Sequence, residues 1–251
     1  MFFHIVVYLY WKLVLQYRER GMNMTYIFRF WHHLRHPNSL TFIVEKEAEK
    51  NKITGYKKAF FTILLLTISL FITRDIWGMY TSRLTELFAL GEFDRYIFAR
   101  YISIIGAILF SLLYFFFHYY FISYALSLLT DIPFKSIQKV QLYVIAVYLL
   151  EKTVEFGIFA IAKFTTLYSP FSTTAVFAQF ISDKWLLFFI NQFTLATFIA
   201  ITLQYIFLSK WVEEDSKGLF AKIISIHIVC AFLIAYLSIS PLLNWIVRGL
   251  S

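Results

Sequence analysis

Cysteine is almost missing from this chain: only Cys230 is present among 251 residues, and it lies inside an apolar run. A single thiol excludes an internal disulfide, a thiolate metal cluster and a redox pair. Charge is also scarce, because Asp, Glu, Lys and Arg make up 15% of the residues, against about 25% in soluble domains. Proline and glycine are few, and the many Phe, Ile and Lys residues indicate an AT-rich bacterial genome.

The sequence motifs of common enzymes are also missing. There is no H-E-x-x-H, no G-x-S-x-G and no phosphate-binding loop. Intramembrane proteases of the CAAX-processing type use a Glu-Glu pair, whereas Glu151 is followed here by Lys152. His32, His33 and His36 have no carboxylate nearby, so we interpret them as interfacial residues and not as metal ligands. We therefore expect a protein that is not an enzyme, with no catalytic residues, no metal and no cofactor.

Apolar residues dominate the composition. Hydrophobic residues make up 60% of the chain and aromatic residues 21%, where an average soluble domain has about 45–50% apolar residues. A soluble core cannot hide this much apolar surface, so a lipid bilayer is the expected partner. The net charge of +8 then indicates basic flanks near anionic head groups, and not a nucleic-acid partner.

Five apolar segments predict transmembrane helices, because long apolar segments in lipid satisfy their backbone hydrogen bonds only as helices. The second is predicted to stop at residues 130–133, and Pro241 lies near the end of the fifth. The expected fold is all-α: a polytopic membrane protein with a five-helix bundle over residues 56–251 and an N-terminal interfacial helix. The five segments are approximately residues 56–77, 102–129, 137–164, 184–208 and 221–247.

Residues 24–55 form a basic and aromatic segment that predicts a cytoplasmic, interfacial position. Pro37 disfavours helix at the residue before it, so a first short helix is expected to end there. Ser39 is then predicted to cap a second short helix over residues 41–51.

Residues 1–23 have two interpretations. They form either a short interfacial helix or an upstream extension that is not translated. Residues 18–21 can be encoded by a bacterial ribosome-binding site, which predicts a translation start at Met24.

Lysine and arginine are distributed unevenly between the predicted loops. With the segment before the first helix inside, the inner loops hold 12 of these residues and the outer loops 7. Because Lys and Arg are enriched in cytoplasmic loops, the bias predicts a cytoplasmic N-terminus and an extracytoplasmic C-terminus in a cell membrane.

Two stretches resemble the Yip family, the Ypt/Rab-interacting-protein-like membrane domain. One runs from Ile27 to Ser39 and includes His36-Pro37-Asn38. The other is the loop at residues 130–136, where Phe134-Lys135 opens the third helix; a Gly that often precedes this pair is missing here. The resemblance implies a five-helix domain without known catalytic residues, and some bacterial members accompany ABC exporters.

Glu151, Lys152 and Glu155 lie near the middle of the third predicted helix. Charges at that depth are costly and usually face a bundle interior. Glu151 and Glu155 are four residues apart and share a helix face, which we expect to contact protein and not lipid. Lys152 is the nearest counter-charge in sequence to these carboxylates, and a residue of a neighbouring helix is the other candidate partner for it. The functional interpretations are a cation or proton site, or contact with a membrane helix of a partner. The structural interpretations are an ion cluster that locks helix packing, or a wide water-filled vestibule.

Other polar residues inside the predicted helices favour packing roles. His118 is expected to be buried and satisfied, and Asn191, Gln192 and Gln204 are expected to hydrogen-bond across helices. The preferred function is an accessory or scaffold subunit of a membrane complex such as an ABC exporter, with a membrane-protein partner or a homo-oligomer. The alternative is a small transporter or channel that uses Glu151 and Glu155, although no inverted repeat is detectable.

Overall fold

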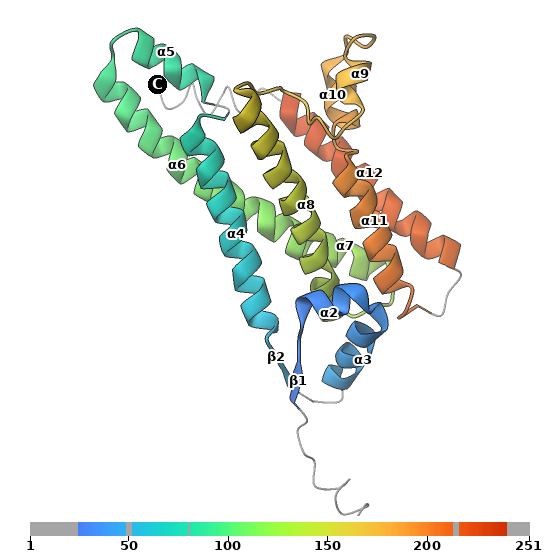
Figure 1. Ribbon diagram of the computed structural model, residues 1–251. Coiled ribbons are helices and arrows are strands. Elements are labelled where there is room, and N and C mark those ends of the chain that lie inside the picture. The colour runs from blue at the N-terminus through green and yellow to red at the C-terminus, as the bar shows by residue number, and fades with distance from the viewer. Residues whose placement is uncertain (1–24, 49–51, 80, 213–215, 240–251) are drawn as a thin grey trace, which may run out of the picture. The chain divides into compact units, whose positions relative to one another are not determined.

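A computed structural model describes residues 25–48, 52–79, 81–212 and 216–239, which are mostly helical (Figure 1). The chain divides into two compact units, residues 1–57 and residues 58–251. The predictions for residues 1–23, for a start at Met24 and for Pro241 lie outside the described residues.

The N-terminal unit contains two short paired strands, and two helices lie in the connection between them. Strand β1 (Thr25–Ile27) runs parallel to β2 (Lys52–Thr54). A parallel pair needs a crossover connection, and α2 (Phe30–Arg35) and α3 (Pro37–Ala48) lie within it. The all-α prediction missed this pair, because three residues per strand are too few to give an alternating pattern.

Pro37 separates α2 from α3 as predicted, and it opens α3 because the first helical position tolerates its missing N–H. The prediction for Ser39 is wrong. Ser39 lies inside α3, where its Oγ donates to the His36 carbonyl oxygen at 2.6 Å. The same hydroxyl lies 2.7 Å from Nδ1 of the buried His33 and so ties α2 to α3.

Among the described residues of the second unit, three helices are long and apolar enough to cross a membrane. The first is α4 (Tyr56–Trp77), with the predicted bounds. The second runs without a break over Phe93–Leu129 and consists of α6 (Phe93–Phe116), the π-helix η1 (Phe117–Phe121) and α7 (Ile122–Leu129). The third is α12 (Ser216–Ile239). The short α5 (Ser82–Ala89) lies between α4 and α6.

The prediction of five long apolar helices is therefore only partly met. The third predicted segment is one helix, α8 (Phe134–Ala162), but its charged residues interrupt the apolar run. The fourth is divided into α10 (Lys184–Ile190) and α11 (Leu195–Leu208) by a break at residues 191–194. The four-residue α9 (Thr174–Phe177) precedes α10.

Helix α8 provides much of the core of the second unit. It packs against α7 and α11 (Figure 1), and its buried side chains include Val144 and Tyr148. These two contact Ala196 and Ala200 of α11. Small residues at a helix contact let two backbones approach closely, which explains why α8 and α11 pack along most of the length of α11.

The connection between α7 and α8 agrees with the predicted stop. Thr130 has extended backbone and ends α7. Pro133 is the N-cap of α8, which begins at Phe134. Proline fixes its own backbone and cannot continue the preceding helix, so α8 starts as a separate helix.

Candidate functional site

The carboxylates of Glu151 and Glu155 point into the unit. Their residues are 9% and 3% exposed, in agreement with the expectation that both face protein. Of the two candidate partners for Lys152, the structure shows the carboxylate on its own helix. The Lys152 Nζ lies 2.8 Å from Oε2 of Glu155 on the same helix, one turn away, and not beside a carboxylate of another helix.

A second cation reaches Glu155 from α4. Nη2 of Arg74 lies 3.9 Å from the same Glu155 Oε2, and both side chains are almost fully buried. The Arg74 Nε donates to the Met79 sulfur at 3.2 Å, and the guanidinium carbon lies 5.6 Å from the centre of the Phe71 ring. A buried charge is tolerated when it is paired, and the pair meets that condition for both residues. Because Arg74 lies on α4 and Glu155 on α8, the ion pair also connects these two helices.

Asp75, next to Arg74, connects α4 to α6. Its Oδ2 lies 3.8 Å from Arg100 Nη1, and its Oδ1 accepts from the Ser103 hydroxyl. Arg100 Nη2 also donates to the Asp75 carbonyl oxygen at 3.0 Å and to that of Ile76 at 3.3 Å. A cation placed on the last carbonyls of a helix is favourable for the helix dipole, so Arg100 stabilises the end of α4.

Glu151 has a different kind of partner. Its Oε2 accepts a hydrogen bond of 2.8 Å from the backbone N–H of Ala196, in the first turn of α11. The first N–H groups of a helix have no partner within the helix, and a carboxylate there also interacts favourably with the dipole. Glu151 therefore acts as a cap that α8 supplies to α11.

The polar residues of the break at 191–194 bond to the ends of α10 and α11 and to the segment before α9. Asn191 Oδ1 accepts from the Ser169 N–H and from the Ser172 hydroxyl, both at 2.9 Å. The Gln192 amide donates to the Phe188 carbonyl oxygen at 3.2 Å, and the Gln192 carbonyl accepts from the Thr197 hydroxyl at 2.7 Å. The prediction of cross-helix bonds from Asn191 and Gln192 is wrong, because both residues close the break.

Gln204 does bond across helices. Its Oε1 lies 2.9 Å from Nε2 of His227 on α12, and both residues are buried. His118 lies in η1, and its ring centre is 4.7 Å from that of Tyr114 and 4.8 Å from that of Tyr148. It is only partly buried and packs among aromatic rings.

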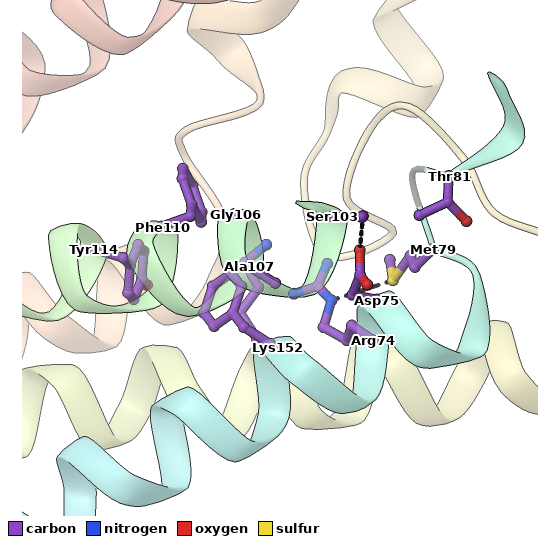
Figure 2. Close-up of a pocket in the computed structure, with 11 residues that line it drawn as sticks. Arg74, Asp75, Met79, Thr81, Ser103, Gly106, Ala107, Phe110, Tyr114 and Lys152 are labelled. Carbon is purple, nitrogen blue, oxygen red and sulfur yellow. Dashed lines mark hydrogen bonds between the residues drawn. The ribbon is translucent and has the colours of Figure 1, made fainter. Parts of the chain in front are cut away.

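A cavity of about 490 Å³ lies beside the ion cluster. Figure 2 shows Arg74 and Asp75 on α4, Ser103 to Tyr114 along α6, and the Lys152 side chain from α8. The cavity is lined by Phe71, Arg74, Asp75, Met79, Thr81, Ser103, Gly106, Ala107, Phe110, Tyr114 and Lys152.

Several residues of this site were missed from the sequence. Arg74 lies near the end of the first predicted segment and Arg100 just before the second, and both were counted as loop charges, which are ordinary. Asp75 and Arg74 could have been recognised from the sequence, because both stand in the last turn of an apolar helix and not beyond it. His227 could also have been singled out, because an ionisable residue inside a long apolar run is unusual.

His32, His33 and His36 are among the described residues. No group of three or more His, Cys, Asp or Glu side chains in the described part of the chain could hold a metal ion. His33 is buried, and burial is the main cause that lowers its pKa from the usual 6.5. The neighbouring His32 lowers the pKa of His33 further.

Comparison with known proteins identifies no relative of this chain. No family model, no curated protein and no solved structure matches it. The resemblance to the Yip family therefore stays a prediction that rests on the two short stretches named above.

Proposed function

We propose that this chain is a multi-pass membrane protein in which α8 and the α10–α11 pair cross the bilayer together with the three long apolar helices. At 1.5 Å per residue, the 29 residues of α8 measure roughly 43 Å, and a bilayer core is about 30 Å thick. Glu151, Lys152 and Glu155 of α8 have partners inside the unit, the arrangement that makes intramembrane charge tolerable. Broken helices are tolerated in membranes when their free backbone groups are satisfied.

Within that membrane domain, we propose a non-catalytic role as an accessory or scaffold subunit of a larger membrane complex, such as an exporter. One observation carries the proposal: both intramembrane carboxylates hold helices together. Glu151 binds the first turn of α11, and Glu155 binds the cations of Lys152 and Arg74. Carboxylates of an ion pathway must exchange partners during transport, whereas these two are engaged in helix contacts.

Purification in a gentle detergent, followed by mass spectrometry of co-purified proteins and by ion-driven uptake in proteoliposomes, tests this role. We expect a defined membrane partner and no uptake by the wild type. Glu151→Gln removes charge but keeps size, and it should lower the melting temperature or partner recovery whatever the ion gradient. Thr153→Ala is the control, because Thr153 is exposed and bonds only to Leu149 of its own helix among the described contacts. Wild-type uptake that vanishes in a stably folded Glu151→Gln protein contradicts the scaffold role.

A small transporter or channel is the second candidate, and the cavity is the observation that favours it. Lys152 lines the cavity and pairs with Glu155, so a charged group of the cluster borders open space. If the chain is a transporter or channel, the uptake assay gives flux in the wild type. A Glu155 variant then loses this flux while it remains folded.

A further inference from the structure

One side of α2 exposes a tryptophan and two arginines. Trp31 is 73% exposed, and the exposed Arg35, four residues later, shares its side of the helix. Arg29, the N-cap residue of α2, is exposed as well. Neither arginine forms an ion pair with a carboxylate among the residues that the structure describes. We call Arg29, Trp31 and Arg35 the α2 face.

The opposite side of α2 fixes the direction of this face. His33 is buried, and its Nδ1 lies 2.7 Å from the Ser39 hydroxyl of α3. The ring centre of His33 is also 5.4 Å from that of Phe28, which precedes α2 and is buried as well. At 3.6 residues per turn, residues 31 and 33 point to nearly opposite sides of a helix. The buried His33 therefore holds Trp31 away from the interior of the N-terminal unit.

Phe28 fastens the start of α2 to the start of α4. The Phe28 N–H donates to the Thr54 carbonyl oxygen at 2.7 Å, and the Phe28 ring lies 5.4 Å from the ring of Tyr56, the first residue of α4. Gly55 stands between them with a φ of +88°, and a Cβ there would lie 2.9 Å from the Phe28 carbonyl oxygen. Glycine permits both the positive φ and the close approach. Trp31 is three residues from Phe28, and three residues reach at most about 11 Å.

The start of α4 is a membrane boundary when α4 crosses the bilayer. Tyr56, Lys57 and Lys58 precede the uncharged centre of this helix. Tyrosine is enriched at the head-group level, and lysine is enriched beside the cytoplasmic ends of transmembrane helices. The link through Phe28 therefore keeps the α2 face within reach of the head groups. This contact depends on the membrane location of α4 that is proposed above.

The charge of the N-terminal segment identifies the kind of lipid. Residues 25–58 contain seven Lys and Arg residues but three Glu residues, and these Glu residues all lie within positions 45–49. The stretch that includes α2, residues 25–44, has no Asp or Glu. A basic residue close to an anionic membrane surface strengthens binding by a factor of about five. The α2 face is therefore complementary to a leaflet with anionic phospholipids.

We propose that the α2 face binds the anionic head groups of the leaflet at which α4 begins. Arg29 and Arg35 contact lipid phosphates, because a guanidinium matches a phosphate with two parallel hydrogen bonds. The ring of Trp31 lies at the head-group level, where its apolar body and its polar N–H both find suitable surroundings. The sequence predicts an interfacial position for residues 24–55, and the structure identifies the side of α2 that makes the contact.

Fluorescence quenching of the full chain in lipid nanodiscs tests the contact. The discs contain dioleoyl phosphatidylcholine alone or equal parts of dioleoyl phosphatidylcholine and phosphatidylglycerol, with the same share of a brominated phosphatidylcholine that quenches nearby indole rings. The difference between the wild type and Trp31→Phe gives the emission of Trp31. We expect Trp31 to be quenched in the mixed discs, and the ratio of lipid-bound to free Trp31 to fall at least about fivefold without phosphatidylglycerol.

Arg29→Gln and Arg35→Gln should each lower this ratio about fivefold in the mixed discs. Arg95→Gln is the matched control, because it removes the same charge from an exposed side chain of α6 that pairs with Glu92. Equal quenching of Trp31 in both kinds of disc, or equal effects of the α2-face and Arg95 variants, overturns the inference. A Trp31 that the brominated lipid does not quench, but that a co-purified protein shields, overturns it as well, because the face then binds protein.

The tryptophans that remain in Trp31→Phe separate this contact from the proposed membrane location. They include Trp77, the last residue of α4. Quenching of these tryptophans without quenching of Trp31 contradicts lipid binding by the α2 face and leaves the membrane location of α4 intact. The absence of quenching at every tryptophan contradicts both proposals.

Discussion

Removal of the Glu151 carboxylate should loosen α11 from α8. Glu151→Ala leaves the buried N–H of Ala196 without its acceptor at 2.8 Å. A hydrogen bond to a charged group contributes about 1.5–3 kcal/mol, and an unsatisfied buried donor costs a similar amount. We therefore expect the free energy of unfolding to fall by about 2–3 kcal/mol. Glu151→Gln keeps an acceptor oxygen and loses mainly the interaction with the helix dipole, so a fall of about 1 kcal/mol is expected.

Denaturant unfolding in mixed micelles, followed by circular dichroism, measures these differences. Thr153→Ala serves again as the control, because substitutions at exposed positions usually change stability by less than about 0.5 kcal/mol. The order of stability should be wild type and Thr153→Ala first, then Glu151→Gln, then Glu151→Ala. A Glu151→Ala protein within about 0.5 kcal/mol of the wild type would refute the role of Glu151 as a cap.

Three further predictions concern other parts of the chain. Alkaline phosphatase fused to the C-terminus should be active, and fusions after Lys135 or Lys217 should be inactive; activity in either inner loop contradicts the proposed topology. In a double-mutant cycle, Gln204→Leu and His227→Leu should couple by roughly 0.6–1.7 kcal/mol, the range for hydrogen bonds between membrane helices, and additive effects argue against the bond. Because the pKa of His33 is lowered in the folded state, the unfolded state binds more protons as the pH falls below about 6.5. Stability should therefore decrease between pH 7.5 and 5.5, and this decrease should be smaller in His33→Gln.

Much of the helix arrangement could be predicted from local patterns. Both ends of α4 follow from an uncharged centre with charged flanks, and the end of α7 follows from the residues before Pro133. The break between α10 and α11 could not be predicted in this way. The groups that satisfy it come from Ser169, Ser172 and Glu151, which lie 19 to 45 residues earlier in the sequence than their partners. A local pattern contains no information on these contacts.

The candidate site, like the fold, could be predicted only in part from the sequence. Glu151 and Glu155 are conspicuous in the sequence because charge is rare inside an apolar helix. Their partners were not predictable, since Arg74 stands at a helix end where cations are common and the Ala196 partner is a backbone group. The cavity depends on how α4, α6 and α8 pack around Gly106, and no single segment determines that packing.

The break at residues 191–194 explains why α8 contains a carboxylate at position 151. In a bilayer core, a backbone group without a partner costs several kcal/mol. The first turn of α11 exposes such N–H groups, and Glu151 satisfies the one on Ala196. Glu155, one turn further along α8, instead holds two cations, Lys152 and Arg74, and both of these border the cavity. The two carboxylates therefore have separate tasks, so substitution of Glu151 tests the attachment of α11 to α8, and substitution of Glu155 changes the charge beside the cavity.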